Sequence, residues 1–451
     1  MKVLKDVFRV AFSNIVGFGT SFLINFMLPA ILTVADYGHY QQYILFISFT
    51  YLFNMGFNDG IYIKYGGKDQ EDLDGEEVQQ EHNFLLVFQL LMFVAMMAVA
   101  IWQRNMIFAL FSVATLLDTI NNYHANFLQA TGRFKVFSNG NVLKSIFNII
   151  ILLIAIFIFQ TDNYYIYILI NISAYLFLTL FFERHYIQQH GWSKTFDPRG
   201  KLKIFQVGFL ILVSNMSLTF VGNIGRWVAN TRYAIEDYAQ YAFQNSLLNV
   251  ILLIVNAVGM VFYNVISRRS DQDLLNTIKQ ACVFLGIASG LAFFIFKQII
   301  LVFFEAYIPS INLLSITFIA IPYIMLSKIL IGNLYKTQVP EKIYFRDSII
   351  YLVLSVILVV GTDTIFNNLQ MVAIATTLCY ILWFVYTTTI KFDYLRNSFK
   401  EILILVSHWL VFYLTANVMG TWTGFGAYAL YLGVVLIFSR KDIVDMMKML
   451  K

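Results

Sequence analysis

Charged residues are scarce in this chain: Asp, Glu, Lys and Arg together make up 13% of its 451 residues. Soluble domains carry about 25% charge, and a soluble chain of this length would need polar surface for two or three domains. Hydrophobic residues make up 59% and aromatic residues 17%, and the mean hydropathy is +0.69. The composition excludes a soluble protein and predicts an all-α polytopic membrane protein.

Cysteine and proline are also rare, with two and five residues respectively. Cys282 and Cys379 lie within apolar segments, so the sequence predicts neither a disulfide framework nor a cysteine metal site. The sequence contains no Gly-rich phosphate loop, and no irregular segment is large enough for a soluble catalytic domain. We therefore expect a transporter rather than an enzyme, with no cofactor, no metal site and no nucleic acid partner.

Long apolar segments, in contrast, are abundant. A bilayer-spanning helix needs roughly 20 mainly apolar residues, and fourteen segments meet this requirement. They lie at about 8–33, 39–63, 83–102, 106–129, 141–160, 164–183, 204–230, 238–266, 279–304, 309–334, 344–361, 369–390, 401–418 and 422–439. The first segment follows a basic start but is too long for a cleaved signal peptide. An even number of spans places both termini on one side of the membrane.

The basic residues gather at alternate connections between these segments. Both termini and every second loop together contain 26 of the 31 Lys and Arg residues. Because cytoplasmic loops carry the excess of Lys and Arg, these connections and both termini are predicted to be cytoplasmic. The other five basic residues are Arg104, Arg226, Arg232, Lys297 and Lys328.

The first and seventh spans are similar in sequence at both ends. The chain reads VFRVAF at 7–12 and IFQVGF at 204–209, and DYGHY at 36–40 corresponds to DYAQY at 237–241. The spacing is 197 residues between the starts and 201 between the outer corners. This predicts a duplicated six-helix unit. Six helices return the chain to its starting side, so the two lobes are parallel repeats related by a pseudo-twofold axis along the membrane normal. The predicted lobes are residues 1–200 and 201–391, followed by an appended helix pair at 392–451.

Polar residues within the spans are the candidates for a central cavity. Charged side chains inside a membrane are costly and usually face a cavity or a partner, and Arg226 in the seventh span shares one helical face with Asn223. The full set of candidates for binding a substrate is Arg226, Lys297, Lys328, Arg9, Asn25, Asn223, Asn245, Asn249 and Tyr241. The alternative for any single amide is a hydrogen bond to a neighbouring helix, and a lysine stem can extend toward the membrane interface.

Asp118 is the candidate for ion coupling. It lies in the middle of the fourth span, on an amide-rich face with Asn121 and Asn122, and near His124. The carboxylate either binds a coupling proton or cation or pairs with a basic residue, and the sequence does not separate these alternatives.

Two inner loops contain residues that resemble functional motifs. Asp72-Leu73-Asp74 in the acidic loop 64–82 is interpreted as solvated surface rather than as a glycosyltransferase motif, because no α/β domain accompanies it. His185 and His190, at the basic loop 184–203, are interpreted as surface residues.

Several short motifs, in this order and spacing, resemble a known family. They are the basic start of the first span, DYGHY at 36–40, NMGFNDG at 54–60, QATGRF at 129–134 and the second corner at Asp237-Tyr238. The chain resembles the polysaccharide repeat-unit flippases, members of the superfamily of multidrug, oligosaccharidyl-lipid and polysaccharide exporters. Many relatives carry an acidic residue beside the arginine of span seven. Here Gly225 and Trp227 flank Arg226, so a charge pair between neighbouring residues is not expected.

The resemblance implies two six-helix lobes around a V-shaped cavity that opens alternately to either side of the bacterial cytoplasmic membrane. The implied substrate is an oligosaccharide on a polyprenyl pyrophosphate, moved from the inner to the outer leaflet, with membrane lipids, glycosyltransferases and a polymerase as partners. The coupling ion, a proton or sodium, is left open. One alternative function is a cation-coupled multidrug antiporter of the same superfamily, which would be expected to place acidic residues in its cavity, whereas the charges within the spans here are mostly basic. The alternative from a different class is a membrane-embedded polysaccharide polymerase, which would be expected to have a large outer loop, and the sequence predicts none.

Overall fold

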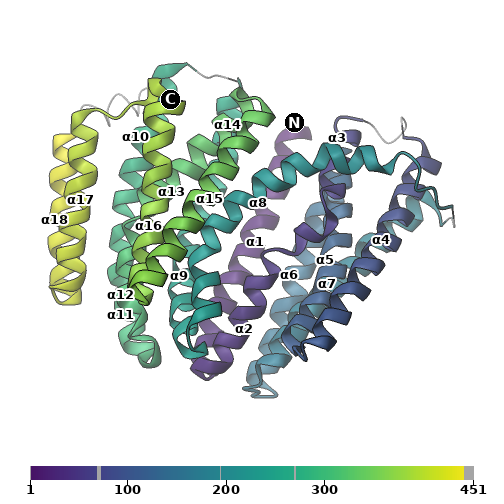
Figure 1. The fold of residues 1–451 in the computed structure, drawn as a ribbon, viewed down its shortest axis with the longest axis horizontal. Helices are drawn as coiled ribbons and strands as arrows, with labels where there is room; N and C mark the ends of the chain where they lie inside the picture. Colours follow the sequence, from purple (N-terminus) through teal and green to yellow (C-terminus); the bar gives the residue numbers. More distant parts are fainter. Residues whose placement is uncertain (1, 69–72, 193–194, 269–270, 441–451) are drawn as a thin grey trace. The chain divides into compact units, whose positions relative to one another are not determined.

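The computed structural model describes residues 2–68, 73–192, 195–268 and 271–440. All regular secondary structure in these ranges is helical, as the composition predicts (Figure 1). The chain divides into two compact units, Met1–Thr219 and Phe220–Lys451, and helix α8 (Lys201–Arg232) contributes residues to both. The predicted lobes 1–200 and 201–391 and the appended pair 392–451 stay predictions.

The first unit is a bundle of long helices with one interrupted span. Its elements are α1 (Lys2–Ile31), α2 (Val34–Ile47), η1 (Thr50–Asn54), α3 (Phe57–Tyr65), α4 (Gly75–Trp102), α5 (Met106–Ala130), α6 (Phe134–Phe157), α7 (Tyr164–His190) and the first part of α8. Helix α5 packs against α4 and α7, and α6 packs against α1 and α7. On α4, Leu90, Leu91 and Val94 are exposed. Such an apolar outer face is expected where lipid, not water, is the solvent.

Polar side chains begin several of these helices. Asn105 accepts a hydrogen bond from the Phe108 amide at the start of α5, and Asn163 accepts one from the Tyr165 amide at the start of α7. Asp74 likewise accepts hydrogen bonds from the first amides of α4. These caps satisfy amide donors that the helix itself leaves unpaired.

Three glycines allow α3 and α8 to approach each other closely within the first unit. A Cβ atom on Gly208 would lie 2.6 Å from the Gly60 nitrogen and would also collide with the Gly56 carbonyl. Gly56 has a φ of 88°, which glycine adopts without steric cost. The contact places Ile204 and Phe205 of α8 against Phe57, in a buried core that also contains Tyr65, Val78, Tyr123 and Tyr186.

The second unit contains more interrupted helices. Its elements are the remainder of α8, α9 (Ile235–Arg268), α10 (Gln272–Ala288), α11 (Gly290–Phe303), η3 (Glu305–Tyr307), α12 (Ser310–Phe318), α13 (Ile321–Leu326), η4 (Ser327–Ile331), α14 (Gly332–Gln338), α15 (Glu341–Phe366), α16 (Leu369–Tyr386), η5 (Thr387–Lys391), η6 (Asp393–Leu395), α17 (Phe399–Asn417) and α18 (Thr421–Phe438).

The span from α12 to α14 is bent by 53° between Ser310–Phe318 and Ile321–Gln338. Pro322 lies in the first turn of α13, where its missing amide donor is tolerated but cannot continue the α12 hydrogen-bond pattern. A Cβ on Gly286 of α10 would lie 2.9 Å from the Pro322 nitrogen, so α10 packs tightly against the bend. Further along, η4 is a π-helical turn, a feature that often marks functional sites.

The C-terminal pair α17–α18 is anchored to α10 by a buried ion pair. The Lys279 ammonium lies 3.0 Å from the Glu401 carboxylate and also donates to the Leu395 carbonyl, 3.0 Å away. Glu401 completes a capping box with Ser398 at the start of α17. One carboxylate therefore both caps its own helix and neutralises a buried cation.

The helices confirm a multi-pass membrane protein. Helical structure covers all fourteen predicted segments, and eleven helices of the described ranges, or twelve with the bent pair, are long and apolar enough to span a membrane. The predicted second span is divided into α2, η1 and α3, and the eighth, α9, does not meet the same test. The count of fourteen spans stays a prediction.

The two corners of the predicted repeat have the same local structure. The Tyr37 amide donates to the Thr33 carbonyl and the Tyr238 amide to the Ala234 carbonyl, both at 2.9 Å. The tyrosines three residues later, Tyr40 and Tyr241, are buried in both units. This local likeness is consistent with a duplication, while the pseudo-twofold relation between the lobes stays a prediction.

Candidate functional site

Arg226 lies in a buried polar cluster of the second unit. Its guanidinium donates to the Asn223 side-chain oxygen at 3.2 Å and to the Tyr238 hydroxyl at 3.5 Å, and the residue is 5% exposed. The structure therefore brings together two of the predicted substrate ligands, Arg226 and Asn223. In the conformation described, the guanidinium is covered by protein, and its role in substrate binding stays a prediction.

Tyr241, Asn245 and Asn249 lie on α9. The Tyr241 side chain is 1% exposed and packs against Gly225, where any Cβ would collide with its hydroxyl and lie 2.9 Å from the Thr376 hydroxyl. The Asn245 amide donates to the Tyr241 carbonyl one turn back, and Asn249 is exposed. Only Asn249 of these three presents an exposed side chain.

Lys297 on α11 contacts a neighbouring helix. Its ammonium donates to the Ala416 carbonyl in the last turn of α17, at 2.7 Å. Cations are favoured at helix C-termini, where carbonyls lack partners within the helix. The bond gives Lys297 a role in holding α11 to α17, and its predicted role with the substrate stays untested.

Lys328 is an exposed cation in the interior of a span. It lies in the π-helical turn η4, between α13 and α14, and its side chain is exposed although Ile329, Leu330 and Ile331 beside it are buried. The turn packs against α9, where the Asn333 amide donates to the Gly259 carbonyl at 3.0 Å. Discontinuous helices commonly form the substrate sites of transporters.

The remaining candidates lie in the first unit. Arg9 and Asn25 are half-buried on α1. The Asp118 carboxylate accepts hydrogen bonds from the Thr50 hydroxyl at 2.5 Å and the Asn122 amide at 3.1 Å. It also interacts electrostatically with Lys144, whose ammonium lies 4.0 Å from the centre of the Tyr175 ring. The structure thus gives Asp118 a basic neighbour, and its ion-coupling role stays a prediction.

A pocket of about 430 Å³ lies between α15 and α16 of the second unit. Its wall is mainly apolar and consists of Arg346, Asp347, Ile350, Tyr351, Leu354, Ser355, Leu358, Cys379, Leu382, Trp383 and Tyr386. The pocket has one charged end, where Arg346 donates to Asp347 at 2.8 Å and the Lys391 ammonium lies 3.3 Å from the same carboxylate. No pattern in the sequence predicted this pocket, because α15 and α16 contribute its residues at scattered positions.

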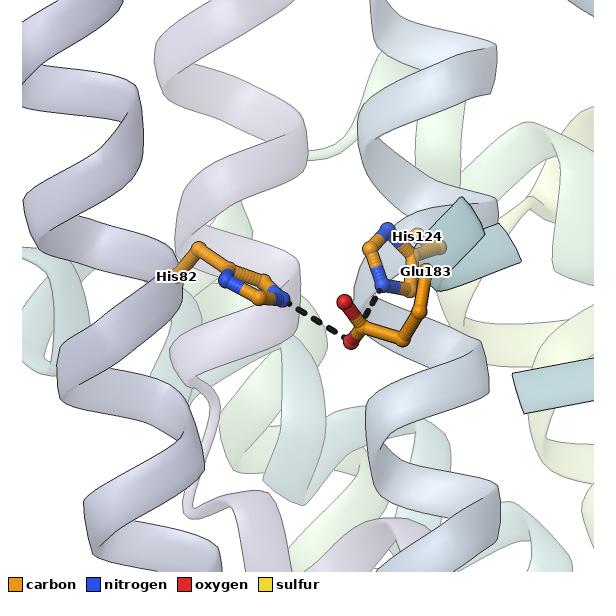
Figure 2. Close-up of side chains that lie close together, drawn as sticks. All are labelled: His82, His124 and Glu183. Carbon is orange, nitrogen blue, oxygen red and sulfur yellow. Dashed lines mark hydrogen bonds and ion pairs between the residues drawn. The ribbon is translucent and has the colours of Figure 1, made fainter. Parts of the chain in front are cut away.

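The sequence also did not predict a cluster of two histidines and a glutamate in the first unit. His82 on α4, His124 on α5 and Glu183 on α7 point toward one another, as Figure 2 shows. The imidazole Nε2 atoms of His82 and His124 lie 2.9 and 3.0 Å from one Glu183 oxygen. Because the three residues lie far apart in the sequence, their spacing contains no metal-ligand signature.

The loop motifs and cysteines have simpler explanations. Asp74 caps α4, whereas Asp72 lies outside the described residues. His185 and His190 are half-buried rather than fully exposed, and His185 lies 2.9 Å from the Gln189 side chain. Cys282 and Cys379 are buried and unpaired, as predicted.

The fold of the whole chain is similar to those of known membrane transporters. It matches the lipid II flippase MurJ in an inward closed conformation with a TM-score of 0.67 at 16% identity, covering 98% of this chain and 100% of the flippase. A multidrug resistance MATE family transporter of the MOP superfamily matches in its inward-facing conformation with a TM-score of 0.59 at 15% identity, covering 86% of this chain and 96% of the transporter. The outward-facing conformation of a MATE family transporter matches with a TM-score of 0.55 at 15% identity, covering 87% of this chain and 97% of the transporter. These identities establish the fold alone.

The sequence identifies the family. Among curated proteins, none matches the sequence. Residues 3–270 match the model of the family described as polysaccharide biosynthesis protein, which confirms the resemblance found in the motifs. This match covers more than half of the chain, and the protein therefore belongs to the polysaccharide biosynthesis protein family, with a fold similar to those of the lipid II flippase MurJ and a MATE family transporter.

Proposed function

We propose that this protein moves polyprenyl-pyrophosphate-linked oligosaccharide repeat units from the inner to the outer leaflet by alternating access, for assembly of a cell-surface polysaccharide. One observation carries the proposal: a member of a polysaccharide biosynthesis family has, over 98% of its length, a fold similar to that of a lipid II flippase. The proposed location is the bacterial cytoplasmic membrane, with both termini in the cytoplasm.

Lys328 is the cation that we assign to the first contact with the pyrophosphate. A pyrophosphate that leaves water loses hydration and needs fixed positive charge in compensation. The Lys328 side chain is exposed although it lies within a span, and it carries a positive charge there. Arg226, whose planar fork suits phosphate oxygens, is buried in this conformation. Its contact with the substrate would therefore require a rearrangement of the cluster with Asn223 and Tyr238.

The pocket between α15 and α16 suits part of the polyprenyl chain. Leu354, Leu358 and Leu382 provide an apolar wall, and burial of apolar chain yields roughly 25 cal/mol per Å² removed from water. Arg346 and Lys391 lie at the charged end, in a region that the distribution of basic residues predicts to be cytoplasmic. A lipid carrying a phosphate at its head would meet both chemistries there.

A cation-coupled multidrug antiporter of the same superfamily is the alternative function, and the MATE-like fold supports it. Such a protein would be expected to hold cationic drugs with acidic side chains. The span-interior cations Arg226 and Lys328 favour an anionic substrate instead. A membrane-embedded polymerase, an enzyme, is the alternative from a different class.

The experiment deletes the gene in its native host and measures lipid-linked glycan on each leaflet, together with exported polysaccharide. We expect export to stop and the intermediate to accumulate in the inner leaflet, with recovery on complementation by the wild-type gene. Lys328→Ala should fail to restore export, and Lys328→Arg should restore much of it. Lys297→Ala is the matched control, because its ammonium already bonds the Ala416 carbonyl, and it should export normally.

Arg226 provides a further comparison at equal membrane expression. Truncating one partner of a desolvated charge pair typically costs about 2–5 kcal/mol, so Arg226→Ala should strongly impair export, and Arg226→Lys should retain part of it. Drug accumulation measured in the same strains distinguishes the two candidate functions, the flippase and the multidrug antiporter. Normal glycan export in the deletion strain together with increased drug retention would show that the protein is an antiporter.

A further inference from the structure

We propose that His82, His124 and Glu183 form a binding site for one divalent transition-metal ion, with zinc as the test ion. Each residue offers one ligand atom, and the three atoms lie within 4.8 Å of one another. Two imidazoles and one carboxylate are a ligand set that suits zinc and similar ions. Mg²⁺ and Ca²⁺ prefer oxygen ligands, so the site should exclude them. The site is separate from the residues that we assign to the transported substrate.

Small movements would bring the ligand atoms to the distances of a tetrahedral centre. Bonds of about 2.1 Å at tetrahedral angles place ligand atoms about 3.4 Å apart. All three ligand atoms lie within 4.8 Å of one another. The two Nε2–Oε1 separations are 2.9 and 3.0 Å, so an ion requires the carboxylate oxygen to move away from each imidazole by about half an ångström. Rotation of the Glu183 side chain, which is 20% exposed, can supply this movement. The two histidines are more rigidly held, at 5% and 2% exposure.

Burial and charge also favour an ion at this position. A carboxylate inside a membrane protein is costly unless it is neutralised. In the hydrogen-bonded arrangement of Figure 2, one Glu183 oxygen meets both imidazoles. A divalent ion would replace both hydrogen bonds with metal bonds and would neutralise the carboxylate while the imidazoles stay neutral. Arg133 contacts Phe127 and Gln189.

The site has access from one end of the first unit. A pocket of about 70 Å³ is lined by His82 and Glu183 and by Gln79, Asn83, Leu86, Tyr186, Ile187, Gly191 and Trp192. It is large enough for a water molecule, which would supply the fourth ligand. The Gln79 side chain donates to the His190 carbonyl, and the Gly67 amide donates to the Ala130 carbonyl at 3.1 Å. The start of α4 thus meets the end of α7, and the segment after α3 meets the end of α5; Val78, Ala130 and Tyr186 of α4, α5 and α7 share one buried core at this end, which the basic loops predict to be cytoplasmic.

An ion bound here would join three helices. His82, His124 and Glu183 come from α4, α5 and α7, and α5 packs between the other two. We assign the ion a structural role, because one ion with a ligand from each of three helices would hold these helices together. A bound ion stabilises the folded state by an amount that grows with the ratio of its concentration to its dissociation constant.

The experiment uses the full-length protein in detergent, freed of metal by a chelator and then titrated with Zn²⁺ or Co²⁺. We expect one equivalent of Zn²⁺ per chain, a rise in unfolding temperature, and a four-coordinate Co²⁺ spectrum that Zn²⁺ abolishes. His124→Asn and Glu183→Gln should each weaken binding by about 100-fold or more, since even residues that only support a ligand are worth 10–100-fold. His185→Asn is the matched control, because His185 lies on α7 two residues from Glu183 and interacts with Gln189.

Two results would overturn the site. One is a metal-free wild-type protein that takes up far less than one equivalent of Zn²⁺. The other is an equal loss of affinity in His185→Asn and His124→Asn, which would place the ion elsewhere. X-ray absorption at the zinc edge of the wild-type protein tests the ligands even where a variant fails to fold. Two imidazoles with oxygen support the site, and a spectrum without imidazole contradicts it. None of these measurements depends on transport, so the site and the proposed function fail independently.

Discussion

Individual polar side chains in both units are held by partners on neighbouring helices. Asp118 accepts hydrogen bonds from Thr50 and Asn122, and Lys297 donates to a backbone carbonyl of another helix. In a membrane such bonds replace those that water would supply, and each contributes roughly 0.6–2 kcal/mol. A residue that binds a transported ion or lipid must exchange such partners during the cycle.

Asp118→Asn tests whether this carboxylate takes part in ion coupling. Because an amide can still bond Thr50 and Asn122, we expect normal protein levels but reduced transport and a weaker dependence on a proton or sodium gradient. Transport of the labelled lipid-linked glycan into the outer leaflet, measured in vesicles with imposed gradients, checks this. Asp162→Asn, an exposed loop position, is the control. Unchanged transport by Asp118→Asn under every gradient would leave the carboxylate a purely structural partner of Lys144.

At the scale of helices, small residues determine which elements can approach closely. Gly56 and Gly60 on one side and Gly208 on the other bring α3 and α8 into backbone contact. This is the spacing of small residues that lets membrane helices pack tightly. The same principle applies in the second unit, where Gly286 admits Pro322 at the bend before α13.

Gly208→Ala should destabilise the first unit. The added methyl group would collide with the backbone of Gly56 and Gly60, and overpacking of this kind typically costs about 1–3 kcal/mol. The measurement is the thermal unfolding midpoint of the purified protein. Gly19→Ala on α1 is the control, because a Cβ there meets nothing within 4 Å, and its midpoint should stay the same or rise. Equal midpoints for both variants would show that the α3–α8 contact yields easily.

At the scale of the whole molecule, the excess of basic residues on one side predicts the topology. Reporter fusions after Lys68, Arg199 and Lys342 should read cytoplasmic, and fusions after Asp162, Asn367 and Thr421 should read outside. Asn367 follows α15 and is preferable to Asp363, which is buried and paired with Arg232. A fusion at Lys451, which lies outside the described residues, should also read cytoplasmic. An inverted set of readings would contradict both the orientation and the two-lobe arrangement.

The sequence determined the class of molecule through properties that need no tertiary contact. Hydropathy predicted where the helices lie, because a span must be about 20 residues long and apolar whatever its neighbours are. The repeated corners at Tyr37 and Tyr238 were also visible, since their local backbone structure follows from adjacent residues. The motifs that indicated the family lie within single spans or the turns beside them.

Only the tertiary structure decided which polar residues meet. The sequence placed Arg226 and Asn223 on one helical face, but the burial of the guanidinium beside Tyr238 depends on how α9 packs against α8. It could not show that Lys297 reaches the end of α17, more than a hundred residues away. His82, His124 and Glu183 have no common spacing, and they meet because α4, α5 and α7 pack side by side at one depth. Side chains on separate helices converge through packing, which hydropathy and local spacing do not encode.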